Sequence, residues 1–309
     1  MTKKRRVLVT GTMRSGTTFV GDILARSQNL FYLQEPFNPT WGIRGVTQWF
    51  PYIRDEDSPY ARIVNQFFDL NFSYCSPADT STIRGRIKRI VGGKNAWLGS
   101  FYRYVGHYFS GMLIKDPLSA LLSRYMHENH RVAVVVLVRH PVAFYYSNKR
   151  LGWDFDLNNL RKQTSLLEDH LQEEALLLEK DWTYPERLAL LWRCINKVLH
   201  EFGANCDGEE MWLVKCHEDI CINPIKEFND IFYNLEINMS EHVINYVESS
   251  TSSGNTISAQ GNDTHQLHRN SEKLAYYWKQ RVSVEERDQI RSMTESVAAR
   301  FYEDESWNL

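Results

Sequence analysis

The sequence has no long apolar run and no excess of charge of either sign, and each absence excludes a class of protein. Its 309 residues contain 36 Lys and Arg against 38 Asp and Glu, a formal net charge of −2. Recognition of nucleic acid by bulk positive charge is therefore not indicated. No apolar stretch approaches the roughly 20 residues that a membrane-spanning helix needs. The apolar run after the basic N-terminal residues, Val7–Val9, is too short for a signal peptide. We expect a cytoplasmic protein with neither a membrane span nor a nucleic-acid partner.

Cysteine is scarce as well. The five cysteines are odd in number and never occur as C-x-x-C. This usage favours buried reduced thiols over a disulfide framework or a zinc site. Apolar residues make up 43% of the chain, which is enough to build a sizeable core.

Residues 7–25, VLVTGTMRSGTTFVGDILA, predict a strand, a tight loop and a helix in direct succession. A β-branched run ends at Gly11, and a helical pattern begins at Thr17. Such a unit directs backbone N–H groups and a helix N-terminus at one point, where they favour a phosphate or another anion. A bare turn without a ligand is the less favoured interpretation.

This loop lacks the lysine of a nucleotide P-loop. Gly11 and Gly16 have the spacing of the first part of that motif, but Thr17 stands in the lysine position. In the motif, the lysine serves the β- and γ-phosphates of a triphosphate. Its absence, with Arg14 inside the loop, predicts a shorter and differently charged ligand.

The chain also lacks a Walker B acid. Residues 131–138, RVAVVVLV, predict a central parallel strand buried on both faces. A P-loop NTPase would place an acidic residue at the end of this strand to hold Mg²⁺. Here Arg139 follows the strand, and Ser147 comes eight positions later in a helix-like segment. A permanent cation there, with a hydroxyl about two helical turns away, suits a phosphate held without metal.

These two elements together resemble the sulfotransferases that use 3′-phosphoadenosine 5′-phosphosulfate (PAPS). The loop RSGTTF, residues 14–19, is similar to the 5′-phosphosulfate loop of that family. Arg139 and Ser147 are similar to its 3′-phosphate element. Arginine in the loop and the segment FYLQEP, residues 31–36, look most like the carbohydrate sulfotransferase branch.

Two weaker likenesses extend the resemblance to about residues 7–232. The segment IKDP, residues 114–117, resembles the loop after the third strand of the family. The segment KCHEDI, residues 215–220, followed by NP at 223–224, resembles a later family segment, with His217 in place of the usual tyrosine.

The resemblance implies which residues bind PAPS and its product PAP, with no metal required. The cofactor-binding residues that it implies are Arg14, Ser15, Gly16, Thr17, Thr18, Phe19, Arg139 and Ser147. The RKG-type loop of the cytosolic enzymes is absent, which leaves Arg269 as the candidate for the adenine side. Lys273 and Trp278 are further late residues of a suitable kind.

The resemblance also implies three catalytic residues: Glu35, Arg14 and Lys115. Glu35 ends the second predicted strand, where similar carbohydrate sulfotransferases carry an acid that acts as general base. Lys115 would stabilise the sulfonate oxygens, and Arg14 would hold the 5′-phosphosulfate with the N–H groups of the loop. Alternatively, Glu35 is a salt-bridge partner of Arg14 or Arg139, and Lys115 is a surface residue. His140 is a competing candidate for the base.

Strands that alternate with helices predict a single α/β domain, residues 1–309, with a mostly parallel sheet and helices on both faces. Strands are expected at 6–10, 30–33, 112–114, 131–138 and 211–214, and long helices at 160–179 and 184–202. Ligands of such sheets bind at the carboxyl ends of the strands. Gly11, Glu35, Lys115 and Arg139 all follow predicted strands, so one cleft could gather them.

Three other segments stand out by their composition. Residues 38–110 are rich in aromatics and irregular, and they either form much of the acceptor pocket or fill core. Residues 249–261 predict a mobile loop. Residues 283–286 predict a capping box that opens the last helix.

The predicted function is the in-line transfer of a sulfuryl group from PAPS to a hydroxyl of a saccharide or glycoconjugate, with Glu35 as base. A small natural product, sulfated at oxygen or nitrogen, is the alternative acceptor. A P-loop kinase or NTPase is a second class of function. Thr17 in the lysine position and Arg139 in the position of the Walker B acid argue against it. A nucleotide-binding module without catalysis is a third, and it would be favoured if Glu35 and Lys115 lay far from the cleft.

Overall fold

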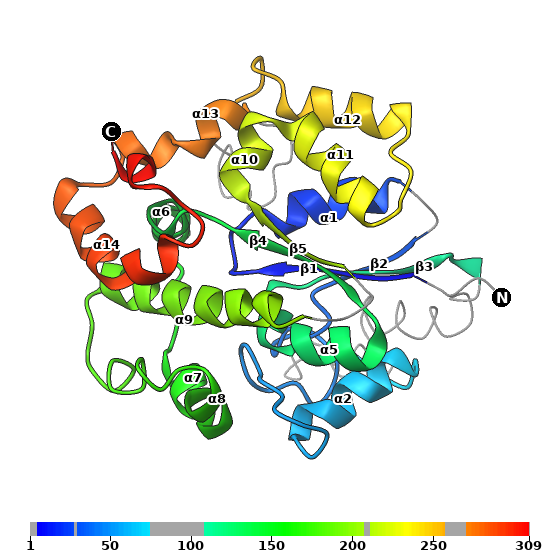
Figure 1. Cartoon of the computed structure of the whole chain (residues 1–309), viewed down its shortest axis with the longest axis horizontal. Helices are drawn as coiled ribbons and strands as arrows, with labels where there is room; N and C mark the ends of the chain where they lie inside the picture. Colours follow the sequence, from blue (N-terminus) through cyan, green and yellow to red (C-terminus); the bar gives the residue numbers. More distant parts are fainter. Residues whose placement is uncertain (1–4, 28–29, 75–107, 207–210, 257–269, 309) are drawn as a thin grey trace, which may run out of the picture.

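A parallel sheet forms the centre of the fold (Figure 1). The structure, a computed structural model, describes residues 5–27, 30–74, 108–206, 211–256 and 270–308. The described strands are β1 (Arg5–Gly11), β2 (Leu30–Gln34), β3 (Gly111–Lys115), β4 (Ala133–Val138) and β5 (Trp212–Cys216). Their order in the sheet is β2-β3-β1-β4-β5. The predicted α/β class is confirmed, and each strand lies within two residues of its predicted bounds.

Alternate residues of the strands face two hydrophobic cores on opposite faces of the sheet. Val7 and Val9 of β1 pack with Leu113 in one core. Leu8, between them, packs with Ile114 in the other. This alternation follows from the two-residue period of a strand. Apolar side chains on both faces are what a parallel sheet between two layers of helices requires.

Helices cover both cores, as predicted (Figure 1). The Val7 core is covered by α1 (Thr17–Ala25), α11 (Pro224–Asn234) and α12 (Glu241–Thr251). The Leu8 core is covered by α2 (Pro59–Phe68), α5 (Ser123–His130), α6 (Pro141–Leu151), α9 (Tyr184–Ala204) and α14 (Val284–Ala298). Shorter helices connect these: η2 (Pro117–Leu122), α7 (Asn158–Arg161), α8 (Thr164–Asp169), α10 (His217–Ile222), α13 (Ser271–Ala275), η3 (Tyr277–Gln280) and η4 (Asp304–Trp307).

The position of β1 between β3 and β4 brings three loops together. The register pairs Val9 with Lys115 on one side and Gly11 with Leu137 on the other. The residues that follow β1, β3 and β4 therefore emerge side by side at the carboxyl edge of the sheet. This edge is where α/β sheets bind their ligands.

The described aromatic residues of segment 38–110 lie mostly in the Leu8 core. Phe50 and Phe67 are fully buried, and Phe67 meets Phe37 edge-on with ring centroids 5.1 Å apart. These contacts support the interpretation that the aromatics of this segment fill core. Residues 75–107 lie outside the described residues, so a contribution of the segment to an acceptor pocket stays a prediction.

The predicted long helix at 160–179 is wrong. The structure has α7 and α8 in its first half and turns in its second half. Gln163 interrupts the helix because its side-chain oxygen accepts a hydrogen bond of 2.8 Å from the backbone amide of Tyr52. Glu174 is fully buried and pairs with Arg193 of α9 at 2.8 Å, which draws the following turns onto that helix.

The C-terminal third contains one correction and one confirmed feature. Residues 249–251, predicted as part of a mobile loop, form the last turn of α12, and residues 257–261 lie outside the described residues. The predicted capping box is present: Ser283 Oγ accepts a hydrogen bond from the Glu286 amide at 3.2 Å, and the Ser283 amide donates to the Glu286 carboxylate at 3.3 Å.

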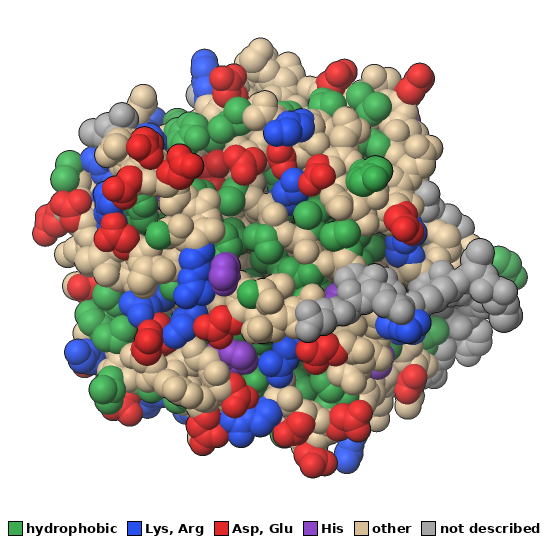
Figure 2. Space-filling view, viewed as in Figure 1, with side chains coloured by type: hydrophobic (Ala, Val, Ile, Leu, Met, Phe, Trp, Pro, Cys, Tyr) green, Lys and Arg blue, Asp and Glu red, His purple; other side chains and the backbone are tan. Residues whose placement is uncertain are grey.

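The surface agrees with the balanced composition. In Figure 2, acidic and basic side chains are interspersed over the visible face. Among the described helices, none combines the length and apolarity that a bilayer crossing requires. The described cysteines are thiols, of which Cys194 and Cys221 are buried.

Candidate active site

Two glycines allow the loop after β1 to pass close to β4 and α10. Gly11 has φ 142° and Gly16 has φ 96°. A Cβ atom on Gly11 would lie 2.1 Å from the carbonyl oxygen of Leu137, and one on Gly16 would lie 2.7 Å from Cδ2 of His217. Because glycine alone adopts such φ values without strain, these two residues determine the path of the loop.

The loop ends at the open N-terminus of α1. Gly16 is the N-cap residue and supplies no side-chain cap, so the N–H groups of Thr17 and Thr18 receive no hydrogen bond from it and have no intrahelical partner. They carry the partial positive charge of the helix dipole. Ser15 shapes the loop from within, because its amide and its hydroxyl both donate to the Thr12 carbonyl, at 3.3 Å and 2.6 Å.

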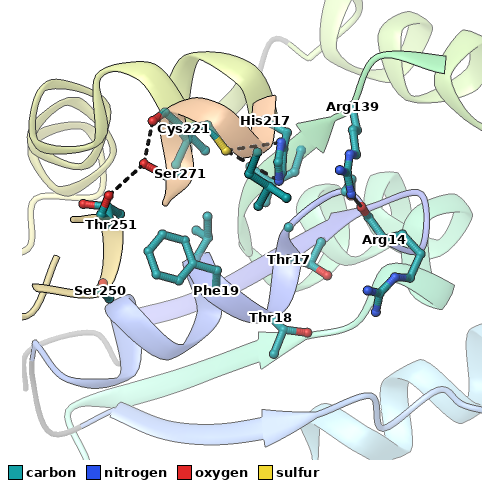
Figure 3. Close-up of a pocket in the computed structure, with 16 residues that line it drawn as sticks. Arg14, Thr17, Thr18, Phe19, Arg139, His217, Cys221, Ser250, Thr251 and Ser271 are labelled. Atoms are coloured by element: carbon teal, nitrogen blue, oxygen red, sulfur yellow. Dashed lines mark hydrogen bonds between the residues drawn. The ribbon is translucent and has the colours of Figure 1, made fainter. Parts of the chain in front are cut away.

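A cavity lies in front of this helix end (Figure 3). Its empty volume is about 870 Å³, including its open mouth. Residues 14–20 line one side, and Leu137 and Arg139 at the end of β4 line another. The rest of the wall comes from α10, from the end of α12 and from α13, with the Phe19 ring facing these helices.

Arg139 brings an incompletely bonded cation to this cavity. Its Nη1 donates to the Arg14 carbonyl at 2.8 Å, while its buried Nε has no hydrogen-bond partner among the described residues. The Arg139 carbonyl accepts from the indole N–H of Trp192 at 2.8 Å, which fixes the backbone. Burial lowers the pKa of Arg139, and the charge of Glu218 opposes this shift. An arginine is nevertheless always charged, so it favours an anionic ligand.

The side chain of Arg14 connects the loop with α6. Its Nε donates to Ser147 Oγ at 3.2 Å, and its guanidinium lies over the ring of Trp153, 5.5 Å from the centroid. Arg14 also has φ 66°, an uncommon conformation for a residue with a side chain. Ser147 does not line the cavity itself, and it adjoins the loop through this contact with Arg14.

Glu35 and Lys115 form an ion pair beside α1. Lys115 Nζ lies 2.6 Å from Glu35 Oε1, and the Lys115 side chain is fully buried. A Cβ atom on Gly21 would lie 2.9 Å from Lys115 Cγ. Gly21 shares a helix face with Thr17 and Thr18, since residues three and four apart are neighbours on a helix. The pair therefore packs on the same face of α1 as Thr17 and Thr18, which line the cavity. Neither Glu35 nor Lys115 is part of the cavity wall.

Hydrogen bonds hold Glu35 in an uncommon conformation. Its φ is 47°, its amide donates to the Lys115 carbonyl at 2.7 Å, and its Oε2 accepts from Asn38 Nδ2 at 3.2 Å. Asp116, fully buried, accepts from the Phe37 amide at 2.7 Å and so anchors the same turn. Burial, and then the charge of Glu35, raise the pKa of Asp116 to about 7. Strained residues of this kind cluster at functional sites.

These contacts bear on two of the alternatives posed by the sequence. Lys115 is not a surface residue, because it is fully buried. Glu35 does form an ion pair, but its partner is Lys115, and neither Arg14 nor Arg139 takes that place.

His140 does not face the cavity. Its Nδ1 accepts from the Val142 amide at 3.3 Å and so caps α6. Its ring stacks on Trp278, with centroids 4.8 Å apart and planes at 11°. Burial lowers the pKa of His140 to about 3. A buried helix cap does not suit a general base, and Trp278, buried in this stack, is not available to adenine either.

The structure brings most of the predicted site residues to one edge of the sheet. The residues that line the cavity are Arg14, Ser15, Gly16, Thr17, Thr18, Phe19 and Arg139. Ser147 contacts Arg14 of the loop, Lys115 packs on Gly21 of α1 with Glu35 paired to it, and Arg269 lies outside the described residues.

Several cavity residues were missed as site residues. His217 and Cys221 of α10 line the wall opposite the loop. They follow a strand at the same sheet edge, and that placement was the available signal. Ser250 and Thr251 had none, because their segment was predicted to be a loop.

The residues of the cavity fit a nucleotide with more than one phosphate. An open helix N-terminus can hold one anion, and Arg139, whose buried Nε has no partner among the described residues, supplies a positive charge for a second. Phe19 of α1, Ile220 of α10 and Leu274 of α13 give the cavity an apolar part, which suits the plane of a nucleobase.

Comparisons with known proteins define the fold. No family model matches the sequence, and no curated protein sequence is similar to it. A solved structure, the sulfotransferase domain from the curacin biosynthetic pathway, superposes with a TM-score of 0.56 at 15% identity, covering 97% of this chain and 99% of that one. The sulfotransferase domain of the Synechococcus PCC 7002 olefin synthase has a TM-score of 0.46 at 16% identity, over 98% of both chains. A Mycobacterium tuberculosis sulfotransferase has a TM-score of 0.37 at 14% identity, over 80% and 71%. The likeness to the curacin domain shows a sulfotransferase-like fold.

Proposed function

We propose that this chain is a PAPS-dependent sulfotransferase that acts on a hydroxyl group. The observation that carries the proposal is one cavity bounded by two anion-binding elements from adjacent strands, the uncapped N-terminus of α1 and the incompletely bonded Arg139. A P-loop NTPase would have an acid for Mg²⁺ after such a strand. The sulfotransferase-like fold agrees with this interpretation.

The chain's own groups would hold the two ends of PAPS. Thr17 and Thr18 direct main-chain N–H groups at the 5′-phosphosulfate, and Arg14 adds charge there. Arg139 and Ser147 bind the 3′-phosphate. When bound, PAPS supplies an activated sulfuryl group. Binding energy at the distant 3′-phosphate orients the reacting end.

Glu35 is the proposed general base. Its carboxylate has one oxygen bonded to Lys115 and the other to Asn38, so its orientation is fixed before an acceptor arrives. It would accept the proton of the acceptor hydroxyl, and Lys115 would neutralise the charge that develops on the sulfonate oxygens.

Thermal unfolding with nucleotides tests the nucleotide assignment. PAP should raise the melting temperature in the presence of EDTA, because a ligand that binds only the native state stabilises it by about 2.7 kcal/mol at a hundredfold excess over Kd. ATP with Mg²⁺ should have a much smaller effect. Equal stabilisation by MgATP, or a need for Mg²⁺, would support a kinase or NTPase.

The proposed acceptor is a saccharide or glycoconjugate. Incubation with ³⁵S-labelled PAPS and panels of oligosaccharides and of small hydroxylated natural products measures transfer directly. Label appearing only in the natural products would replace the saccharide by that alternative. Absence of transfer to any acceptor, with PAP binding intact, would support the nucleotide-binding module.

A further inference from the structure

Glu218 is a buried carboxylate that stands behind Arg139 without bonding to it. It is 5% exposed and lies in the first turn of α10. Its Oε1 accepts from the amide of His140, the residue after Arg139, at 3.1 Å. The charges of Glu218 and Arg139 act on each other, since each opposes the pKa shift that burial causes in the other. No hydrogen bond or ion pair joins the two side chains in the described part of the chain.

The second oxygen of Glu218 is occupied by the C-terminal segment. Tyr302 donates its hydroxyl to Glu218 Oε2 at 2.8 Å. Both carboxylate oxygens thus accept hydrogen bonds from groups other than Arg139, and the buried Nε of Arg139 stays without a partner. The backbone of Arg139 is held separately, because its carbonyl accepts a hydrogen bond from the indole N–H of Trp192.

We propose that Glu218 and Tyr302 are positioning residues for Arg139, and that they keep the charge of its guanidinium compensated and its Nε without a protein partner, ready for the 3′-phosphate. The inference rests on the proposed function, because it assigns Arg139 to that phosphate. Glu218 offsets part of the cost of a buried cation. Tyr302 prevents the carboxylate from turning to bond to the guanidinium and occupying the phosphate site. Recognition of the cofactor therefore depends on a C-terminal residue outside the cavity wall.

The two residues should have opposite effects when they are changed. Tyr302→Phe frees one carboxylate oxygen, which then turns toward Arg139 and competes with the phosphate. Glu218→Gln keeps the size, and its amide oxygen can still accept from the His140 amide while its NH2 donates to the Tyr302 oxygen, but it removes a negative charge that repels the phosphate. The first change should weaken PAP binding, and the second should strengthen it.

The test compares PAP with adenosine 5′-phosphate, which lacks the 3′-phosphate, by isothermal titration of the full chain. Tyr302→Phe should weaken PAP binding about tenfold, and Glu218→Gln should strengthen it about threefold or more. Both should leave the affinity for adenosine 5′-phosphate within about twofold. Tyr125→Phe and Glu174→Gln are matched controls that lie away from the cavity. The first removes a buried hydroxyl that donates to Asn65, and the second neutralises a buried carboxylate that pairs with Arg193. Neither should change the preference for PAP.

The outcomes separate this inference from the proposed function. If wild type prefers PAP and Arg139→Ala abolishes the preference, the nucleotide assignment stands whatever the two variants do. The inference is overturned if Tyr302→Phe and Glu218→Gln change both nucleotides equally, change neither, or change PAP in the same direction. A wild-type protein without preference for PAP would overturn the nucleotide assignment itself.

Discussion

Arg139 and Ser147 approach the same loop residue, Arg14, from β4 and from α6. Arg139 donates to its carbonyl and Ser147 accepts from its side chain. We therefore expect Arg139→Ala and Ser147→Ala to weaken PAP binding unequally. Loss of a buried charged partner costs about 2–5 kcal/mol, which is at least about thirtyfold in Kd, whereas loss of a neutral hydroxyl costs about 1 kcal/mol. Titration calorimetry of the folded variants measures both values. Unchanged affinity in Arg139→Ala would remove the 3′-phosphate assignment.

Glu35 combines a strained backbone with a fixed carboxylate. Its substitution tests whether the residue takes part in the transfer step rather than in PAP binding. Glu35→Gln keeps the size but removes the proton acceptor, so the single-turnover rate should fall by about 10² to 10⁴. PAP affinity should stay within a few fold. The variant also leaves buried Lys115 with a neutral partner, which destabilises the fold, so urea unfolding is measured on the same preparation. A folded variant that keeps more than a tenth of the wild-type rate would argue against Glu35 as base.

The N-terminus of α1 performs its proposed role only because Gly16 precedes it. Gly16→Ala should destabilise the protein by about 1–3 kcal/mol, because φ 96° strains any residue with a side chain and the new methyl group meets His217. PAP affinity should fall with it, since the loop must shift. Gly152→Ala is the matched control: its φ is 64° and no atom lies within 4 Å of the added Cβ. Calorimetry that finds equal PAP affinity in Gly16→Ala and in Gly152→Ala would contradict this role.

At the scale of the whole molecule, the titration of His140 should contribute a loss of stability in acid. Its pKa is lowered to about 3 in the native state, against about 6.5 in the unfolded chain. Between these values the unfolded state binds more protons at His140, so the contribution of this residue is fully present above pH 6.5 and falls by about 1.4 kcal/mol per pH unit below it. Asp116, whose pKa is raised, contributes in the opposite direction over this range.

Urea unfolding at pH 7 and pH 5 measures this slope. His140→Asn keeps a side-chain cap for α6 but cannot titrate, so its slope should be shallower by that amount. His242→Asn, on the exposed side of α12, should keep the wild-type slope. An unchanged slope in His140→Asn would place the acid sensitivity elsewhere.

The strands, the loop after β1 and the capping box follow from local sequence. Strand period, glycine spacing and capping residues act over a few neighbouring positions, and the parallel sheet follows from the alternation of strands with helices. The carboxyl-edge rule then predicts that Gly11, Glu35, Lys115 and Arg139 lie near one another, and β1 between β3 and β4 places them there.

The partners of these residues were decided by tertiary structure. The burial of Lys115, the pairing of Glu35 with it, and the stacking of His140 on Trp278 join residues that are distant in the sequence. The break at Gln163 and the helical turn at 249–251 likewise depend on contacts made only in the folded chain. A sequence specifies hydrogen-bonding capacity and charge at each position, but which groups share a buried space is fixed by packing. The loop could therefore be predicted from the sequence alone. The hydrogen bonding of Arg139, on which the proposed recognition depends, could not.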